Sequence, residues 1–310
     1  MATVTASMVK DLRDKTGAGM MDCKAALSET SGDMEAAVDW LRKKGLSKAA
    51  KKAGRVAAEG LIGVAARADA GALVEVNSET DFVARNDEFK EFVKEASHLG
   101  LEAEGDVEKL LVSNMKSGSS VEAVLKELIA KIGENMSVRR ATALAVSPGV
   151  VATYVHNTAA PELGKIGVLV GLKSTADQTK LAALGRQIAM HVAAAAPLAL
   201  TPEHLPADAV EREREIQRDL ARQSGKPENV IEKMMEGRMR KYYEDTVLLA
   251  QKYLGPGAEG DVTVAQLVQN ESKKLGAPIE VVGFVRYAVG EGIDKGSTDF
   301  ADEVKQMAGH

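Results

Sequence analysis

Residues 61–76, LIGVAARADAGALVEV, contain two short apolar runs on either side of a turn signal. The runs at 61–65 and 73–76 have the pattern of β-strands. An Asp, an Ala and a Gly lie between them at 69–71, in the position that a hairpin turn takes. The stretch therefore predicts two antiparallel strands, around which the rest of the fold can be arranged.

Helices and a third strand follow this hairpin. Apolar side chains recur at helical spacing between Phe89 and Ala96. A further helical region near 106–131 is interrupted at 117–119, where Ser and Gly residues cluster. Residues 136–144 then have the pattern of a third strand. Together these segments make one unit of strands and covering helices.

The same order of elements recurs later in the chain. Residues 150–155 and 166–170 form a second predicted strand pair, and 279–289 supply its third strand. Apolar side chains between Leu181 and Val192 mark one face of an intervening helix. We therefore predict an α+β fold with two related halves, each a three-stranded antiparallel sheet with helices on one side.

The first 55 residues predict an all-helical module. Three apolar faces follow one another, with breaks at 16–19 and near Gly32. Three short helices around one small core would bury these faces. The faces consist of Val4, Met8 and Leu12, of Met20, Cys23 and Leu27, and of Met34, Ala37, Val38 and Leu41.

A basic stretch at 42–55 ends this module and contains no acidic residue. Such a run is most often the solvated face of a linker helix. The alternative is a docking site for an acidic protein surface or for RNA. RNA is the weaker alternative because no aromatic side chains are interleaved with the charges.

An insertion in the second half predicts a pair of helices. Residues 210–223 are charged and helical, with Ile216 and Leu220 as sparse apolar positions, and 224–227 break the helix. A second helix carries a Met-rich apolar stripe at 230–239. The pair predicts an antiparallel hairpin that projects from the body and presents an adaptable face to a partner. The alternative is a helix pair folded onto the sheet.

The segment 77–86, NSETDFVARN, connects a strand to the helix that follows it. Ser78 and Asp81 have the spacing of a capping box, which predicts a short helical turn near 80–85. Asn86 can cap the next helix. Connections of this kind often carry binding residues.

Phe82 is the one large aromatic residue of this segment, in a chain with only five Phe, five Tyr and one Trp. One interpretation is a core anchor, since Phe is among the residues most often buried. The other is an exposed apolar tip, since aromatic residues dominate the binding energy of many interfaces. The residues alone leave both interpretations open.

Composition limits the classes of function. The net charge of −5 argues against a general nucleic-acid coat. A single Cys excludes internal disulfides and multi-cysteine metal sites. We find no apolar run near the ~20 residues of a membrane span and no secretory signal pattern at the start, so a cytoplasmic protein is expected.

The sequence contains no convincing catalytic constellation. The chain has no phosphate-binding loop and no nucleophile elbow, and its five His residues show no metal-ligand spacing. Two classes of function remain, a non-enzymatic binding protein and an enzyme whose site is assembled from dispersed residues. The lack of a catalytic motif in the sequence favours the binding protein.

Two stretches resemble the signatures of one known family. TDFVA at 80–84 and LRDKTGAGMMDCKAAL at 12–27 are similar to the signatures of elongation factor Ts, and the likeness runs essentially end to end. Members of that family are guanine-nucleotide exchange factors for elongation factor Tu. The resemblance therefore implies a non-enzymatic exchange factor.

The resemblance also implies a division of the chain. It places a ubiquitin-associated-like helical module with its basic linker at 1–55, core half one at 56–146, core half two at 147–200 and 240–290, an inserted coiled-coil hairpin at 201–239, and a C-terminal helical module at 291–310. In the family, the C-terminal helix, here at 300–307, is a further contact on the partner.

The implied partner is elongation factor Tu, in its GDP-bound and nucleotide-free forms. No cofactor, metal ligand, direct nucleic-acid contact or membrane contact is expected, and Asp81 is not expected to bind metal itself. A homodimer and a heterotetramer with the partner both stay open. The residues assigned to dislocation of Mg²⁺ from the partner are Thr80, Asp81, Phe82 and Val83, with Met20 and Met21 in support.

Overall fold

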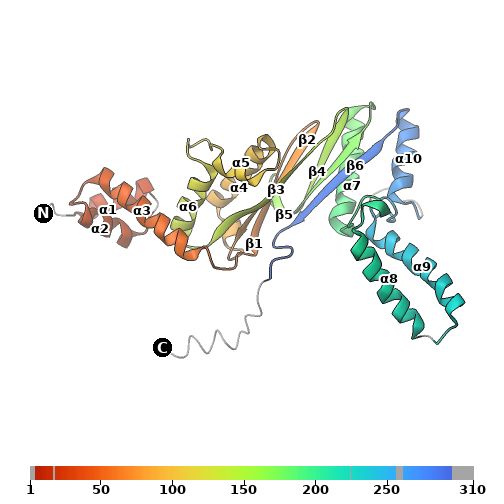
Figure 1. The fold of residues 1–310 in the computed structure, drawn as a ribbon. Coiled ribbons are helices and arrows are strands. Elements are labelled where there is room, and N and C mark those ends of the chain that lie inside the picture. Colours follow the sequence, from red (N-terminus) through yellow and green to blue (C-terminus); the bar gives the residue numbers. More distant parts are fainter. Residues whose placement is uncertain (1–3, 17, 224, 256–260, 295–310) are drawn as a thin grey trace.

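The computed structural model describes residues 4–16, 18–223, 225–255 and 261–294 (Figure 1). Helices combine with antiparallel strands, as in an α+β fold. The N-terminal helices lie at one end of the molecule and a helical hairpin lies at the other (Figure 1). Among the described helices, none is long and apolar enough to cross a membrane. The predicted helix at 300–307 lies outside the described residues.

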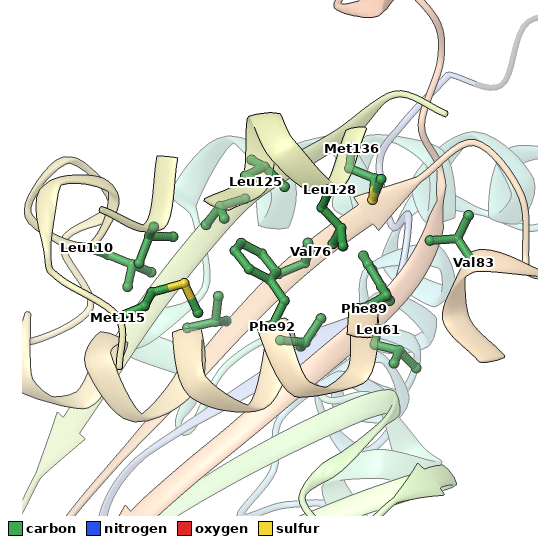
Figure 2. Close-up of a cluster of buried hydrophobic side chains, with 14 of the residues drawn as sticks. Leu61, Val76, Val83, Phe89, Phe92, Leu110, Met115, Leu125, Leu128 and Met136 are labelled. Carbon is green, nitrogen blue, oxygen red and sulfur yellow. The ribbon is translucent and has the colours of Figure 1, made fainter. Parts of the chain in front are cut away.

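The predicted hairpin and its third strand form one antiparallel triplet, and three helices cover a face of it. These elements are β1 (Glu59–Arg67), β2 (Ala70–Ser78), β3 (Met136–Ala145), α4 (Asp87–Glu102), α5 (Val107–Val112) and α6 (Val121–Ile132). Strand β2 is the middle strand. Phe89 and Phe92 of α4 lie in the buried cluster between helices and strands (Figure 2). The predicted cap of α4 is confirmed, because the Asn86 side chain accepts a hydrogen bond from the Phe89 N–H at 3.1 Å.

The second half repeats this arrangement. Its elements are β4 (Gly149–Ala160), β5 (Leu163–Lys173), β6 (Glu280–Ala288), α7 (Gln178–Ala195) and α10 (Val264–Leu275). Strand β5 is the middle strand and pairs with β4 and β6. Leu181, Ile188 and Val192 of α7 are buried in a core with side chains of these strands. Each half therefore consists of a hairpin joined by a strand from later in the chain.

Contrary to the expectation of separate sheets, the two triplets form one six-stranded sheet. Strand β1 pairs with β5 through a short ladder between 62–63 and 163–164. The face of each triplet that its helices leave uncovered is also apolar. Leu73, Val151 and Leu169 are buried together in a cluster that both halves share. Burial of this second apolar face stabilises the joined sheet.

The fully buried Glu75 of β2 ties the two halves together electrostatically. Its carboxylate pairs with Arg139 and Arg140 of β3 and accepts a hydrogen bond from the N–H of Gly290, after β6, at 2.8 Å. Burial by itself raises the pKa of Glu75, but hydrogen bonds from Gly290, Asn77 and Arg140, together with the Arg140 charge, outweigh it and lower the pKa. The carboxylate therefore stays ionised inside the fold.

The N-terminal module consists of α1 (Ala6–Thr16), α2 (Met20–Glu29) and α3 (Met34–Lys52). Leu12, Cys23, Leu27 and Ala37 are buried in its core. Met20 departs from the predicted inward face, since 59% of it is exposed. It is the first residue of α2, at the edge of this small core.

The basic stretch at 42–55 continues α3 and packs partly on the chain's own α6. Arg42 lies 3.7 Å from the carboxylate of Glu127. Gly45 approaches Ala130 so closely that an added Cβ would lie 2.9 Å from the Ala130 Cβ. The stretch is therefore not simply a solvated linker, because it fastens the N-terminal module to the first half.

The insertion forms two helices that project from the sheet (Figure 1). They are α8 (Ala207–Arg222) and α9 (Glu228–Thr246), preceded by the short 3-10 turn η2 (Pro202–His204). Ile216 and Leu220 are exposed, whereas Ala221, Met235 and Met239 are buried. The expected Met-rich partner face is therefore wrong in part. Small Ala221 lets the flexible Met side chains fill the interior of the hairpin itself.

Candidate functional site

The predicted contact segment forms a tight connection between β2 and α4, with one turn of 3-10 helix, η1 (Val83–Arg85). Val83 is only 3% exposed, and its side chain lies in the cluster that contains Phe89 and Met136 (Figure 2). Phe82, in contrast, is 72% exposed. Phe82 is therefore an exposed tip, and the neighbouring Val83 is the anchor. In this conformation Val83 presents little surface to a partner, and its assignment to the partner contact stays a prediction.

Thr80 is held in place by the loop between α6 and β3. The Glu134 carboxylate accepts hydrogen bonds from the Thr80 N–H at 2.9 Å and from its hydroxyl at 2.7 Å. Gly133 ends α6 with a φ of 91°, a left-handed conformation that suits glycine. The neighbouring Glu79 carboxylate accepts a hydrogen bond from the Asn135 N–H. The segment is thus fastened at its base while its tip is exposed.

Asp81 and Arg85 form an exposed ion pair, with 2.9 Å between Nη2 and Oδ2. The Arg85 guanidinium also lies 5.8 Å from the centre of the Phe82 ring. The predicted capping box of Ser78 and Asp81 is wrong, because the Ser78 hydroxyl donates to the Thr80 carbonyl at 2.9 Å. Ser78 is the buried last residue of β2, and this bond within the connection satisfies its hydroxyl.

Met20 and Met21 are both exposed, at 59% and 77%. They lie on α2 of the N-terminal module, whose α3 packs on α6. Helix α6 ends at Ile132, two residues before Glu134, the residue that holds Thr80. The module and the segment at 80–83 are therefore connected through α6, although Met20 and Met21 come from a separate unit.

Two residues of this site, Glu134 and Arg85, were not identified from the sequence. Arg85 had a usable signal, since Asp81 and Arg85 have the i, i+4 spacing of a helical ion pair. Glu134 had only a weak one, as an acidic residue after a helix-ending Gly. Within the described ranges there is no group of three or more His, Cys, Asp or Glu that could hold a metal ion.

Comparison with known proteins identifies relatives along the whole chain. A family model described as elongation factor TS matches residues 79–291, which include the contact segment. The chain is 56% identical over 310 residues to elongation factor Ts of Rhodospirillum centenum, with 100% of both chains covered. It is 59% identical over 309 residues to elongation factor Ts of Parvibaculum lavamentivorans, with 99% of both covered. For the protein of the same name from Maricaulis maris, identity is 56% over 313 residues, with 100% of this chain and 99% of the relative covered.

An exposed aromatic residue on an anchored turn is the kind of residue that dominates binding interfaces. The matches place the chain among the translation elongation factors of protein biosynthesis. The chain belongs to the elongation factor Ts family.

Proposed function

We propose that this protein binds elongation factor Tu, in its GDP-bound and nucleotide-free forms, and accelerates GDP release so that GTP can bind. It acts by binding and catalyses no chemical reaction. The observation that carries the proposal is the exposure of Phe82 on a turn that Val83 and Glu134 anchor. Such preorganisation reduces the entropy lost when the tip enters a partner.

The exchange mechanism follows from reciprocal linkage. A GTPase holds GDP through backbone N–H groups, a Lys and a Mg²⁺ ion. A factor that binds the nucleotide-free form more tightly than the GDP form weakens GDP binding by the same ratio. GDP therefore leaves faster if contacts with the factor form before the nucleotide has gone.

Within this mechanism, Phe82 enters an apolar crevice of the GTPase and Asp81 disturbs the hydrogen bonds that position the water molecules on Mg²⁺. Mg²⁺ requires near-ideal octahedral geometry, so a small displacement costs it much of its binding free energy. Thr80 holds the segment in place, and Met20 and Met21 support the contact from the N-terminal module.

We also propose that the chain consists of five units, which share the remaining contacts with the partner. The units are 1–55, 56–146, 147–200 with 240–290, 201–239 and 291–310. Because α9 continues to Thr246, we extend the hairpin unit to that residue, and the second core half then resumes at 247. The protein acts in the cytoplasm without binding nucleic acid or a membrane. Light scattering, alone and with elongation factor Tu, distinguishes a homodimer and a heterotetramer from smaller assemblies.

The test of the proposed function is release of labelled GDP from elongation factor Tu at fixed Mg²⁺ concentration, with and without this protein. We expect catalytic amounts of the protein to accelerate release, and the protein alone to consume no nucleotide. A GTPase of another family serves as the control and should be unaffected. Unchanged GDP release in a mixture where the two proteins form a complex would overturn the exchange mechanism.

A further inference from the structure

A hollow of about 300 Å³ opens beside Asp81, between the first half and the exposed end of β4. Asp81, Arg85 and Lys90 line one side of it. Asn157 of β4 and Lys165 of β5 line the other side. The hollow therefore joins the contact segment to the second half of the molecule.

The described lining of the hollow carries three cations and one carboxylate. Arg85 pairs with Asp81 inside the hollow. Lys90 lies 3.0 Å from Asp87, and Lys165 lies 3.2 Å from Glu59, from Nζ to carboxylate oxygen. Neither of these two acidic partners is among the described residues that line the hollow. Each of the three cations therefore already has a carboxylate partner, and an incoming anion would share their remaining N–H donors.

Asn157 lies at an irregularity of β4, on the lining of the hollow. Its φ is 51°, in the left-handed region that non-glycine residues rarely adopt. The register of β4 against β5 shifts just after it, between Thr158 and Ala160. Irregularities of this kind re-aim side chains and are common beside functional sites. The Asn157 side chain supplies an amide donor in a hollow that otherwise offers mainly cations.

We propose that this hollow receives a carboxylate side chain of the protein partner, which under the proposed function is elongation factor Tu. Arg85, Lys90 and the Asn157 amide supply charge-assisted hydrogen bonds to it. The exposed Phe82 ring beside Asp81 makes the hollow continuous with the proposed contact. The partner's carboxylate also competes with Asp81 for Arg85, which releases Asp81 to act on the magnesium-bound water.

A nucleic-acid phosphate is the less favoured occupant of the same hollow. Asp81 would repel a chain of phosphates, and the described lining offers no aromatic side chain on which a base could stack. The net charge of the whole protein, −5, also opposes the approach of a polyanion. Asp81 and the net charge of the protein repel a single carboxylate on a protein surface less strongly than a chain of phosphates.

Two lysines one turn apart on α4 provide a matched test. Lys90 lines the hollow, whereas Lys94 pairs with Glu162 at 3.2 Å and does not belong to the described lining. We expect Lys90→Gln to raise the Kd for nucleotide-free elongation factor Tu about 5- to 10-fold at low salt, and the deficit to shrink as salt screens the attraction. Lys94→Gln should change Kd less than about twofold at all salt concentrations.

Asn157→Gly is the second variant, because Gly tolerates the left-handed backbone while removing the amide. It should weaken binding by a smaller factor than Lys90→Gln, and its deficit should depend less on salt. Equal binding by wild type, Lys90→Gln and Asn157→Gly would overturn the inference. If binding were equal in those three proteins but Phe82→Ala weakened the same complex, only the assignment of the hollow would fail, and the proposed function would stand.

The competing outcomes are distinguishable in the same set of proteins. If the wild-type protein did not bind elongation factor Tu, the proposed function itself would fail. Labelled single-stranded RNA is the remaining probe, and we expect no binding that depends on Lys90. Lys90→Gln could instead abolish RNA binding and leave binding to elongation factor Tu unchanged. The occupant of the hollow would then be a nucleic-acid phosphate and not a carboxylate of the protein partner.

Discussion

Glu134 accepts two hydrogen bonds from Thr80, one from the backbone N–H at 2.9 Å and one from the hydroxyl at 2.7 Å. This contact joins the loop before β3 to the start of the proposed contact segment. Charge-assisted hydrogen bonds of this kind hold a turn more firmly than neutral ones. The orientation of Asp81 and Phe82 therefore depends on a residue that lies outside their own segment.

Glu134→Ala should loosen the segment without removing its binding residues. We expect a loss of about 1–3 kcal/mol in the free energy of unfolding, because two part-buried donors on Thr80 lose their acceptor. GDP release should slow, and hydrogen exchange of the amides between Thr80 and Arg85 should accelerate. Glu134→Gln, which keeps one carbonyl oxygen, should fall between wild type and Ala. Wild-type exchange activity in Glu134→Ala would show that Glu134 does not position the segment.

Phe82→Ala should separate folding from function. Because the ring is 72% exposed, the free energy of unfolding should change by less than about 0.5 kcal/mol. A buried Phe would instead cost about 3–5 kcal/mol. Loss of a binding hot spot should weaken the complex by about 2 kcal/mol, or roughly 30-fold in affinity.

The measurements for Phe82→Ala are chemical denaturation and release of labelled GDP. Val112→Ala is the matched control, since Val112 is also 72% exposed but lies on α5. It should leave both measurements unchanged. A folded Phe82→Ala protein with normal exchange would remove the segment from the mechanism.

Asp81→Asn removes the charge of the proposed lever and keeps its shape. Its ion pair with Arg85 is exposed, so the free energy of unfolding should change by less than about 1 kcal/mol. GDP release should slow, and the deficit should grow as free Mg²⁺ is raised, because the ion then competes better for its site. Asp69→Asn, whose exposed ion pair with Arg67 lies at the turn between β1 and β2, is the control. A deficit that does not depend on Mg²⁺ would exclude action of Asp81 through the ion.

Much of the fold could be predicted because local periodicity decides it. The helix through Phe89 and the cap at Asn86 follow from spacing and side-chain chemistry within ten residues. The joining of the two triplets could not be predicted, since it depends on apolar residues such as Leu73 and Leu169 on the second face of each triplet. Alternation along a strand does not tell which of two apolar faces meets a helix and which meets another strand.

The sequence indicated the exposed residue of the candidate site, Phe82, but not the residues that anchor the turn, Val83 and Glu134. Phe82 stood out because aromatic residues are scarce in this chain. The assignment of Val83 to the partner stays a prediction, but the burial of Val83 could not be predicted, because packing beneath a turn decides which of its residues is buried. Glu134 escaped notice because it is 54 residues away from Thr80 in the sequence.

Buried His191 predicts a specific sensitivity to acid. Its Nδ1 accepts a hydrogen bond from the Leu254 N–H at 3.2 Å, so the proton resides on Nε2, which donates to Gln251 Oε1 at 2.9 Å. Burial lowers the pKa of His191, and the hydrogen bond to Gln251 only partly opposes this effect. The folded protein therefore keeps His191 neutral where the unfolded chain already binds a proton.

The sign of the effect follows from this difference in proton binding. Neutral His191 makes its full contribution to the free energy of unfolding above the pKa of the unfolded chain, about 6.5. This contribution falls as the pH drops towards the lower pKa of the folded protein. The slope from this residue is at most about 1.4 kcal/mol per pH unit. Urea denaturation at pH 7.5 and pH 5.5 should show a larger loss for wild type than for His191→Gln, whose amide can still donate to Gln251. Equal losses in the two proteins would exclude His191 as the cause.

Gly45→Ala tests whether the packing of α3 on α6 sets the position of the N-terminal module. An added Cβ would lie 2.9 Å from the Ala130 Cβ, so the two helices must move apart. Overpacking of this kind typically costs about 1–3 kcal/mol. Because Met20 and Met21 are on the displaced module, GDP release should slow although every proposed contact residue is still present.

Two further variants make the result of Gly45→Ala interpretable. Gly237→Ala makes the same change inside α9, where nothing lies within 4 Å of the added Cβ, and it should stabilise the hairpin by about 0.5–1 kcal/mol without affecting exchange. Ala130→Gly, combined with Gly45→Ala, restores the space between the helices. The double variant should recover most of the exchange rate, which is the non-additivity expected of two residues in contact. If GDP release stayed slow in the double variant, helix spacing would not be the reason for the defect.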